Sequence, residues 1–179
     1  MNSFHFTNPE DIINSLEVRK GMIVADFGAG TGAYVMLLAM RVGAMGRVYA
    51  VEVQKDFLTT IKNTAVELGL ENIEVIWGDI EKRGGTKIKD HYVDLVIISN
   101  TLFQAEDKKG LLGEAKRILK VGGQLLIIDW SDSFNNLGPT PVMIVSAKTT
   151  RALCGVEGFI YKKEIPVGDH HYGLIFLKI

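Results

Sequence analysis

A glycine-rich turn, Gly28-Ala29-Gly30-Thr31-Gly32, directly follows the apolar run Met22–Phe27. Glycines permit positive backbone φ angles and leave no Cβ between the backbone and a ligand. The helix expected after the turn presents unpaired N–H groups that can bind a carboxylate or a phosphate. Ligands of open α/β sheets bind beyond the carboxyl ends of the strands. The turn therefore predicts a small-ligand site at a strand end.

The glycine spacing alone fits two classes of ligand. Gly28-x-Gly30-x-x-Ala33 satisfies the pattern of dinucleotide-binding proteins. Glu52 follows at about 20 residues beyond the loop, where an acid that binds a ribose is expected. An NAD-binding oxidoreductase is therefore one hypothesis.

Two further acids favour a different ligand. Asp26 stands two residues before the first glycine, where its carboxylate would repel a pyrophosphate but not a ligand with an ammonium and a sulfonium. Gly78-Asp79 directly follows an expected strand, so Asp79 reaches the ligand edge, where it can accept a hydrogen bond from an adenine amino group. A chain of 179 residues also leaves little room for the substrate domain of a dehydrogenase.

The elements that position these residues alternate between short β-branched runs and amphipathic helices. Phe57, Ile61, Ala65 and Leu68 form the expected apolar face of the second helix. The segment Asp79–Tyr92 lacks helical periodicity, so we expect a loop there. The alternation predicts a parallel sheet with helices on both faces. The expected strands are Met22–Phe27, Arg47–Val53, Ile73–Trp77, Val93–Ser99 and Gln124–Asp129, and the expected helices are Tyr34–Val42, Lys55–Leu68 and Asp107–Leu119, the last ended by Gly122-Gly123.

The end of the chain departs from this alternation. Thr140–Leu153 is predicted to be a helix with Pro141 in its first turn. Two strand-like runs follow, Gly158–Ile165 and Tyr172–Ile179, and the connection between them is too short for a parallel crossover. These strands are therefore expected to be antiparallel. A short helix begun after Asn8 precedes the first strand, and residues 1–16 are interpreted either as a cap on the sheet or as a lid over the ligand.

Several segments resemble one protein family. Asp26–Gly32 (DFGAGTG) resembles motif I of the class I S-adenosylmethionine-dependent methyltransferases. Glu52 is similar to their second-strand acid, and Gly78-Asp79 is similar to their third-strand pair that contacts adenine. Asp94–Asn100 looks like their fourth-strand motif. Leu119–Leu125 (LKVGGQL) resembles the passage before their fifth strand, with Val121 at the position of a proline.

Within this family the chain looks nearest to small stand-alone methyltransferase-domain proteins of the ubiquinone/menaquinone-biosynthesis and arsenite methyltransferase group. The resemblance implies one domain over residues 1–179, a Rossmann-like three-layer αβα sandwich. Its seven-stranded sheet would be mostly parallel, with an antiparallel C-terminal hairpin. It also implies S-adenosylmethionine as the cofactor and methyl transfer by in-line displacement to a small-molecule acceptor. A catalytically silent S-adenosylmethionine-binding module is a further alternative.

The resemblance assigns roles to single residues. Glu52 would accept hydrogen bonds from both ribose hydroxyls, and Asp79 would bind the adenine amino group. Asp26 would orient the methionine ammonium. Val53 and Ile80 would pack beside the adenine, and Asn100 and Thr101 would reach the methionyl end. The complete predicted cofactor set is Asp26, Gly28, Ala29, Gly30, Thr31, Gly32, Glu52, Val53, Gly78, Asp79, Ile80, Asn100 and Thr101.

No residue is identified as the general base from the sequence. His170 and His171 are candidates because the turn between the last two strands should reach the ligand edge. An exposed turn histidine without a catalytic role is the alternative. His91 precedes the fourth strand and is expected at the opposite edge. The lone Cys154 is interpreted as buried packing rather than as a nucleophile.

Composition excludes several other classes. The formal net charge is -1, from 20 basic and 21 acidic side chains, which argues against a nucleic-acid partner. One cysteine permits no internal disulfide, and the four histidines show no zinc-like spacing with it, so we expect no metal. No apolar run approaches the ~20 residues of a membrane span. We therefore expect a cytoplasmic protein without a membrane partner, and we leave its oligomeric state open.

Overall fold

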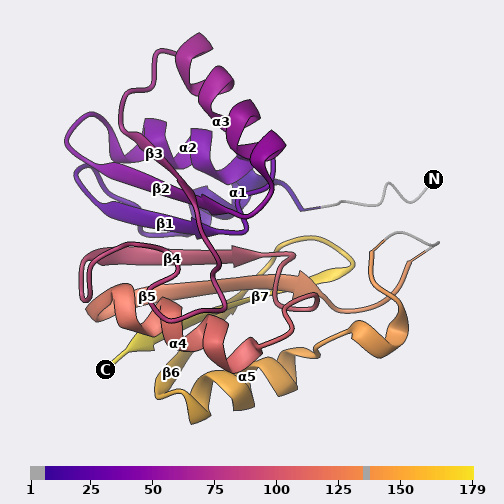
Figure 1. The fold of residues 1–179 in the computed structure, drawn as a ribbon. Helices are drawn as coiled ribbons and strands as arrows, with labels where there is room; N and C mark the ends of the chain where they lie inside the picture. Colours follow the sequence, from indigo (N-terminus) through magenta and orange to yellow (C-terminus); the bar gives the residue numbers. More distant parts are fainter. Residues whose placement is uncertain (1–6, 135–137) are drawn as a thin grey trace.

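Seven strands form a single sheet in the order β3-β2-β1-β4-β5-β7-β6 (Figure 1). The computed structural model describes residues 7–134 and 138–179. β1 to β5 are parallel, whereas β7 is antiparallel to both β5 and β6. The predicted mostly parallel sheet with an antiparallel C-terminal hairpin is confirmed. The strands are β1 Ile23–Phe27, β2 Arg47–Glu52, β3 Ile73–Trp77, β4 Val93–Ser99, β5 Leu119–Trp130, β6 Phe159–Ile165 and β7 His171–Lys178.

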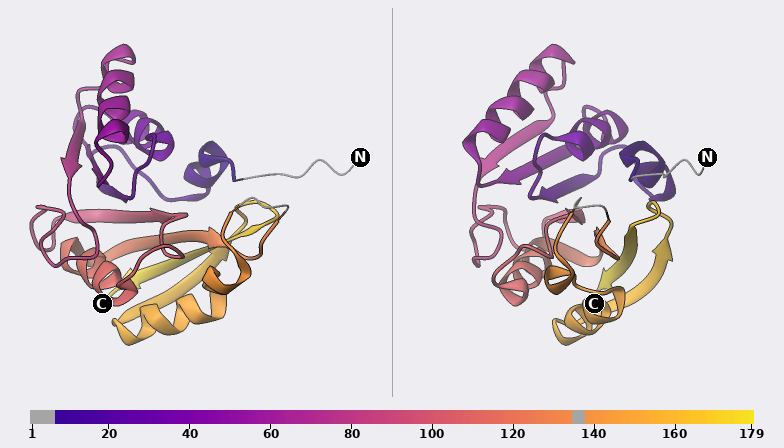
Figure 2. Two further views of the ribbon diagram at one scale, coloured as in Figure 1. Left: turned by 45° about the vertical axis from the view of Figure 1, so that its right-hand side comes forward. Right: turned by 90° about the vertical axis from the view of Figure 1, so that its right-hand side faces the viewer.

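Helices cover both faces of the sheet, as Figure 2 shows from two further directions. One face carries α1 (Pro9–Ser15), α2 (Ala33–Val42) and α3 (Lys55–Glu67). The other face carries α4 (Lys108–Ile118) and α5 (Ala147–Val156), with the short 3-10 helix η1 (Pro141–Met143) before α5. The predicted three-layer αβα arrangement is therefore confirmed.

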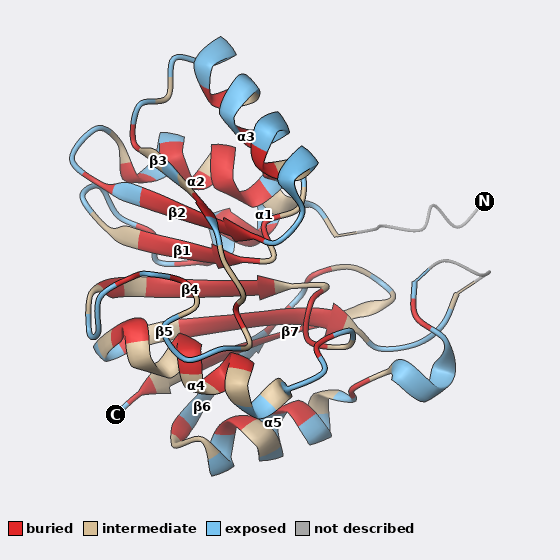
Figure 3. Ribbon diagram, viewed as in Figure 1, coloured by how far each residue is buried: buried red, intermediate tan, exposed pale blue. Residues whose placement is uncertain are grey.

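Two apolar clusters hold the layers together, and the period-2 alternation of each strand divides its side chains between them. In β1, Val24 packs with α1 and α2, whereas Phe27 packs on the side of α4. β4 is buried through nearly its whole length, as expected for a strand covered on both faces (Figure 3). Each fully buried apolar side chain contributes about 1.5–3 kcal/mol. The central strands are thus fixed firmly, and their carboxyl ends provide a rigid edge.

The described part of the segment before the first strand packs against the apolar cluster around α2. Asn8 caps α1 by accepting the Glu10 N–H at 3.1 Å, and Pro9 occupies the first turn. Ile12 and Ile13 are each 1% exposed and join the cluster around α2. The described part of this segment therefore contributes to the core. A lid formed by residues 1–16 stays a prediction, and residues 1–6 lie outside the described residues.

Three predicted elements need correction. Thr140–Leu153 is not one helix: η1 covers Pro141–Met143, and α5 begins only after Ser146, whose hydroxyl accepts the Thr149 N–H at 3.1 Å. The fifth strand begins at Leu119 and not after Gly122-Gly123, because Leu119 already pairs with Val93 before a register shift.

The apolar face of α3 also differs from its prediction. Leu58, Ile61 and Ala65 are the buried residues of this helix. Leu68 is 53% exposed. Phe57 is only partly buried and turns toward the cavity described below. In the first turn of α3, the buried face is therefore shifted by one residue from the predicted one, from Phe57 to Leu58.

The crossover from β3 to β4 has no helix, as predicted for Asp79–Tyr92. His91 lies at the amino-terminal edge of the sheet, where its Nδ1 is 2.9 Å from the Lys178 ammonium, which confirms the expected placement. Among the described residues, no helix is long and apolar enough to cross a membrane.

Candidate functional site

A cavity of about 440 Å³ opens at the carboxyl ends of β1, β2, β3 and β4. Its volume lies within the range of small-molecule and cofactor sites. Nine of the thirteen predicted cofactor residues line it: Gly28, Gly30, Glu52, Val53, Gly78, Asp79, Ile80, Asn100 and Thr101. The structure thus brings residues from four separate strand ends around one space.

The glycine turn approaches the cavity with bare backbone. Gly28 has φ 71°, and a Cβ built on it would lie 2.6 Å from the Thr101 Oγ1. Gly30 has φ 51°, and no heavy atom beyond Gly30 and its two chain neighbours lies within 4 Å of the Cβ position. Both conformations favour glycine. The first glycine is therefore required by close packing, and the second leaves open space for a ligand.

Glu52 closes the opposite wall and is only 6% exposed. Its Oε2 accepts the Gly30 N–H at 3.0 Å, which ties the end of β2 to the glycine turn. Its Oε1 accepts the N–H groups of Val53 at 2.8 Å and Gln54 at 3.0 Å. Sequence reasoning did not foresee these three backbone bonds. Glu52 therefore orders the loop in addition to facing the cavity.

Asp79 follows β3 and stands at the far end of the cavity. Its Oδ2 lies 3.0 Å from the Lys82 ammonium, and its Oδ1 accepts the Glu81 N–H at 3.0 Å. The hydrogen bond from Lys82, with that from Glu81, lowers the pKa of Asp79 below its ordinary value. The carboxylate is thus ionised at neutral pH and can accept a hydrogen bond from a ligand.

Asp26 is buried beneath the cavity and does not line it. Burial, with the neighbouring Glu52 carboxylate, raises the pKa of Asp26 to about 7. A carboxyl group with that pKa changes charge near neutral pH, and a nearby cation would favour its ionised form. The contact of Asp26 with a ligand ammonium stays a prediction. Because Asp26 does not line the cavity, this contact requires a bridging group or a shift of the loop.

The end of β4 supplies a polar corner. Asn100 has φ 52°, which is uncommon for a residue other than glycine. Its Oδ1 is buried and has no hydrogen-bond partner among the described residues. Thr101 donates its hydroxyl to the Ser99 carbonyl oxygen at 3.0 Å. The unpaired amide oxygen marks this corner as a place where a ligand donor would be accepted.

Three other predicted residues support the turn without lining the cavity: Ala29, Thr31 and Gly32. Gly32 is the N-cap of α2 with φ 88°. Lining residues that sequence reasoning missed are Val51, Gln54, Phe57, Glu81, Ser99, Gln104 and Ala105. Val51 and Ser99 adjoin predicted residues, so their place at the strand ends was a usable signal.

Asp129, at the end of β5, lies outside the cavity lining but supports it from below. It is fully buried, and its Oδ2 accepts the Phe103 N–H at 3.0 Å while its Oδ1 accepts the Trp130 N–H at 2.8 Å. Burial raises the pKa of Asp129 to about 6 despite these donors. Asp129 thus holds the segment that follows Thr101 against the sheet.

The two candidate histidines lie at the same edge, but neither is among the described residues that line the cavity. His170 places its Nδ1 2.9 Å from an Asp132 carboxylate oxygen, and its ring stacks on Phe134. His171 lies with its ring centroid 4.2 Å from that of Trp130. Both ring nitrogens of His171 are buried without a hydrogen-bond partner among the described residues. Burial lowers the pKa of His171, so its imidazole is neutral at pH 7.

Metal and thiol chemistry find little support in the described residues. No group of three or more histidine, cysteine or acidic side chains there is arranged to hold a metal ion. Cys154 is fully buried, and burial raises the pKa of its thiol to about 12. An un-ionised thiol is a poor nucleophile. The interpretation of Cys154 as packing agrees with this environment.

Comparison with known proteins identifies relatives of one kind. The chain is 32% identical over 133 residues to the ubiquinone/menaquinone biosynthesis C-methyltransferase UbiE of Neisseria meningitidis, covering 74% of this chain and 51% of that protein. The chain spans about half the length of the curated relatives it matches.

Solved structures share the whole fold. A S-adenosylmethionine-dependent methyltransferase from Aquifex aeolicus matches with a TM-score of 0.88 and 28% identity, over 97% of this chain and 91% of that one. An arsenic(III) S-adenosylmethionine methyltransferase from Chlamydomonas reinhardtii shares the fold alone, with a TM-score of 0.72 and 22% identity over 90% and 65% of the two chains. The family model of the methyltransferase domain matches residues 18–165. The chain therefore belongs to the methyltransferase domain family, as its motifs predicted.

Proposed function

We propose that this protein is a S-adenosylmethionine-dependent methyltransferase that acts on a small molecule. The observation that carries the proposal is the cavity at the ends of β1 to β4, which combines the open backbone of Gly30 with the carboxylates of Glu52 and Asp79. An NAD-binding oxidoreductase is not favoured, because the family and its structural relatives are methyltransferases.

The residues present fit this donor. The bare turn at Gly30 leaves space for a ligand against the backbone, and the buried amide oxygen of Asn100 lacks a donor among the described residues. Glu52 offers acceptor oxygens suited to a ribose, and Asp79 offers one suited to an amino group. Val53 and Ile80 also line the cavity and supply apolar surface for the adenine. With Asn100 and Thr101 at the end of β4, the lining offers acceptors for the sugar, the base and the amino-acid part of a nucleoside joined to an amino acid.

When bound, S-adenosylmethionine supplies a methyl group on a sulfonium, which is already an activated leaving group. The protein must therefore place the acceptor in line with that methyl group and exclude water, and proximity alone can contribute about 7–11 kcal/mol. Glu52 and Asp79 would fix the nucleoside by its two ends. Asn100 and Thr101 would hold the methionyl part, with Asp26 balancing its ammonium charge.

We propose that the acceptor lies beside Trp130 and His171. In the sheet, Ser99 pairs with Ile128, which pairs with Gly173, so β7 is two strands away from the cavity corner at β4. Neighbouring strands lie about 4.8 Å apart, which puts β7 roughly 10 Å from that corner. A small, partly apolar acceptor can bridge this distance. The neutral imidazole of His171 would take a proton from it after the residues around the ring move apart, because both ring nitrogens are buried in the described structure. His170, bonded to Asp132, would support the turn.

Isothermal titration tests the donor assignment. We expect micromolar binding of S-adenosylhomocysteine and no binding of NAD, and the reverse result would overturn the proposal. Incubation with radiolabelled S-adenosylmethionine and metabolite pools then tests turnover. Donor binding with no methylated product from any pool would support the silent-module alternative. With an acceptor identified, His171→Phe should lower kcat far more than it raises KM, because phenylalanine keeps the ring beside Trp130 but cannot accept a proton.

A further inference from the structure

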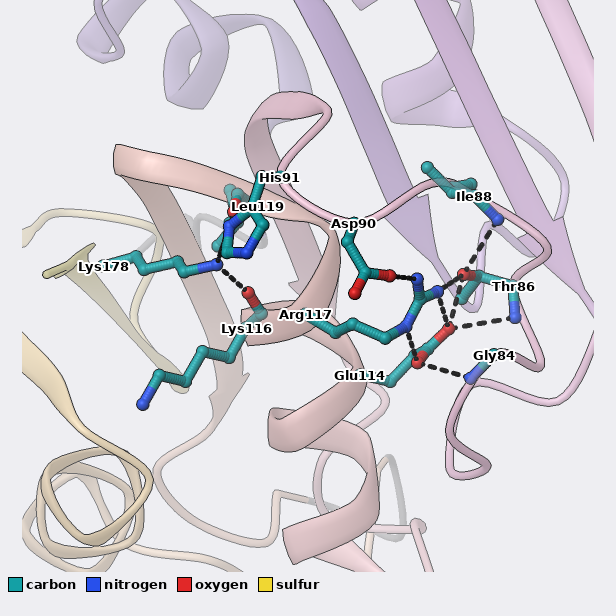
Figure 4. Close-up of polar contacts among 10 residues, drawn as sticks. All are labelled: Gly84, Thr86, Ile88, Asp90, His91, Glu114, Lys116, Arg117, Leu119 and Lys178. Atoms are coloured by element: carbon teal, nitrogen blue, oxygen red, sulfur yellow. Dashed lines mark hydrogen bonds and ion pairs between the residues drawn. The ribbon is translucent and has the colours of Figure 1, made fainter.

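Glu114 of α4 is the centre of a buried polar cluster beneath the crossover between β3 and β4 (Figure 4). Its carboxylate accepts the Gly84 N–H at 2.8 Å, the Thr86 N–H at 3.2 Å and the Thr86 hydroxyl at 2.6 Å. Arg117 completes the cluster, with its Nε 2.8 Å and its Nη2 2.7 Å from the two carboxylate oxygens. Glu114 is 1% exposed and Thr86 is fully buried. Helix α4 thus binds the crossover at two residues, Gly84 and Thr86. We call Glu114 and Arg117, with these contacts, the clamp.

The charge on this clamp is maintained at neutral pH. Burial alone would raise the pKa of Glu114, but hydrogen bonds from Arg117, Thr86 and Gly84 outweigh it and lower the pKa to about 2. Arg117 adds two further contacts with the crossover, because it also donates hydrogen bonds to the Asp90 carboxylate and to the Thr86 hydroxyl. A buried ion pair whose members are all hydrogen-bonded fixes geometry even where its net stabilisation is small.

The clamp reaches the cavity through direct backbone contacts. Gly85 lies between the two gripped residues, and a Cβ built on it would be 2.0 Å from the Asp79 carbonyl oxygen. A Cβ on Gly78 would be 2.4 Å from the Gly85 carbonyl oxygen. The Gly85 N–H also donates to the Lys82 carbonyl oxygen at 2.8 Å, and the Lys82 ammonium pairs with Asp79. The backbone of residues 84–86 therefore lies directly against the backbone of Gly78 and Asp79.

We propose that Glu114 and Arg117 are positioning residues for the nucleoside end of the methyl donor. They press the turn at Gly85 against the Gly78-Asp79 turn, and this contact sets the direction of the Asp79 carboxylate. The inference rests on the proposed function, since it takes Asp79 as the group that accepts the adenine amino group. Neither Glu114 nor Arg117 lines the cavity, so they act through the crossover alone.

Recognition of the amino group gives a readout that stability does not affect. S-inosylhomocysteine carries a carbonyl oxygen where S-adenosylhomocysteine carries the amino group, so it cannot donate to Asp79 from that position. The unaltered protein should prefer the adenosyl compound by about tenfold or more, the value of one charged hydrogen bond. Thr86→Val and Glu114→Gln should each reduce this preference several-fold. Asp79→Ala should abolish it and serves as the positive control.

A matched variant separates positioning from loss of stability. Asn72 is 8% exposed and donates to the Ala39 and Gly43 carbonyl oxygens at 2.8 and 2.9 Å. It directly precedes β3, so it lies at the amino-terminal ends of the strands, away from the cavity. Asn72→Ala should lower the thermal midpoint and leave the preference unchanged.

Two results would count against the proposal in different ways. Folded Thr86→Val protein with the unaltered preference overturns it, and this variant decides the matter if Glu114→Gln fails to fold. Failure of the unaltered protein to bind S-adenosylhomocysteine overturns the proposed function, and this inference with it.

Discussion

Replacement of Glu52 by alanine should weaken binding of S-adenosylhomocysteine by a factor that reveals how the ribose is held. A carboxylate has about four lone-pair positions. Three of them already accept backbone N–H groups, two on Oε1 and one, from Gly30, on Oε2. One position therefore stays open for a ribose hydroxyl. A second hydroxyl can be accepted only if one of these three N–H groups turns away from the carboxylate.

The expected magnitude follows from this count. One charged hydrogen bond contributes about 1.5 kcal/mol at the lower end of its range, which corresponds to roughly tenfold in Kd. Two such bonds would give about a hundredfold. The free energy of unfolding should fall by less than the binding free energy, because Val53 is 54% exposed and water can replace the carboxylate as the acceptor of its N–H. We expect a loss of about 1 kcal/mol, or roughly 2–4 °C in Tm.

Isothermal titration at 25 °C with S-adenosylhomocysteine measures the factor, and thermal denaturation monitors the fold. Glu52→Gln is the matched control: it keeps the shape and one acceptor oxygen but removes the charge, so its loss should be intermediate. A Kd for Glu52→Ala within twofold of the unaltered protein, with a native thermal transition, would refute the reasoning. In that case the backbone bonds would be the whole role of Glu52.

Three further predictions follow from described contacts. The pKa of Asp26 rises from 3.8 in the unfolded chain to about 7 in the folded protein. Between these pH values the folded state keeps a proton that the unfolded chain has released. Asp26 therefore lowers the free energy of unfolding increasingly as the pH rises from about 4 to about 7, by at most about 4 kcal/mol. Asp26→Asn should therefore raise Tm over the unaltered protein at pH 8 and not at pH 4; equal shifts at both pH values in calorimetry would contradict this. Gly28→Ala should destabilise the fold by about 1–3 kcal/mol, because the new Cβ meets the Thr101 side chain. Adding Thr101→Ala in the same chain should recover part of this loss in a denaturant titration. If nothing is recovered, the loss comes from the positive φ of residue 28 alone. Ile13→Ala should cost about 2–5 kcal/mol while donor affinity stays within twofold if α1 is a cap, and a larger change in affinity would favour the lid.

The strand ends of the site were predictable because each follows an apolar, β-branched run. Glu52 is the last residue of β2, Asp79 follows β3 by two residues, and Asn100 directly follows β4. Parallel strands bring their carboxyl ends to one edge. The partners of these side chains were not predictable. The three N–H groups on Glu52 belong to two different segments, and which of them face the carboxylate depends on how the glycine turn is folded.

Residues away from the strand ends were harder to assign. Helical periodicity placed Phe57 on the core face of α3, but this residue lies in the first turn, above the sheet edge, and lines the cavity instead. Leu58 takes its place in the core. Gln104 and Ala105 lie in a loop without periodicity or motif, so their place in the cavity comes only from tertiary packing.

The C-terminal elements show where local signals are ambiguous. Pro141 suits the first turn of an α-helix and a 3-10 helix equally, so it could not locate the start of α5. Ser146 was the effective signal, because its side chain caps the helix. Gly122 has φ 77° inside β5, at the irregular pairing with β4, although a glycine pair after a helix usually marks a break.

The position of β7 between β5 and β6 has a consequence for synthesis of the chain. The ribosome releases β6 before the strand that it pairs with, whereas β1 to β4 can already associate while the rest is being made. Until His171–Lys178 emerges, one side of β5 and both sides of β6 carry unpaired backbone N–H and C=O groups. Such open edges are templates for pairing with other chains. Nascent or prematurely terminated chains of this protein should therefore depend on chaperones, and they should aggregate more readily than the finished fold.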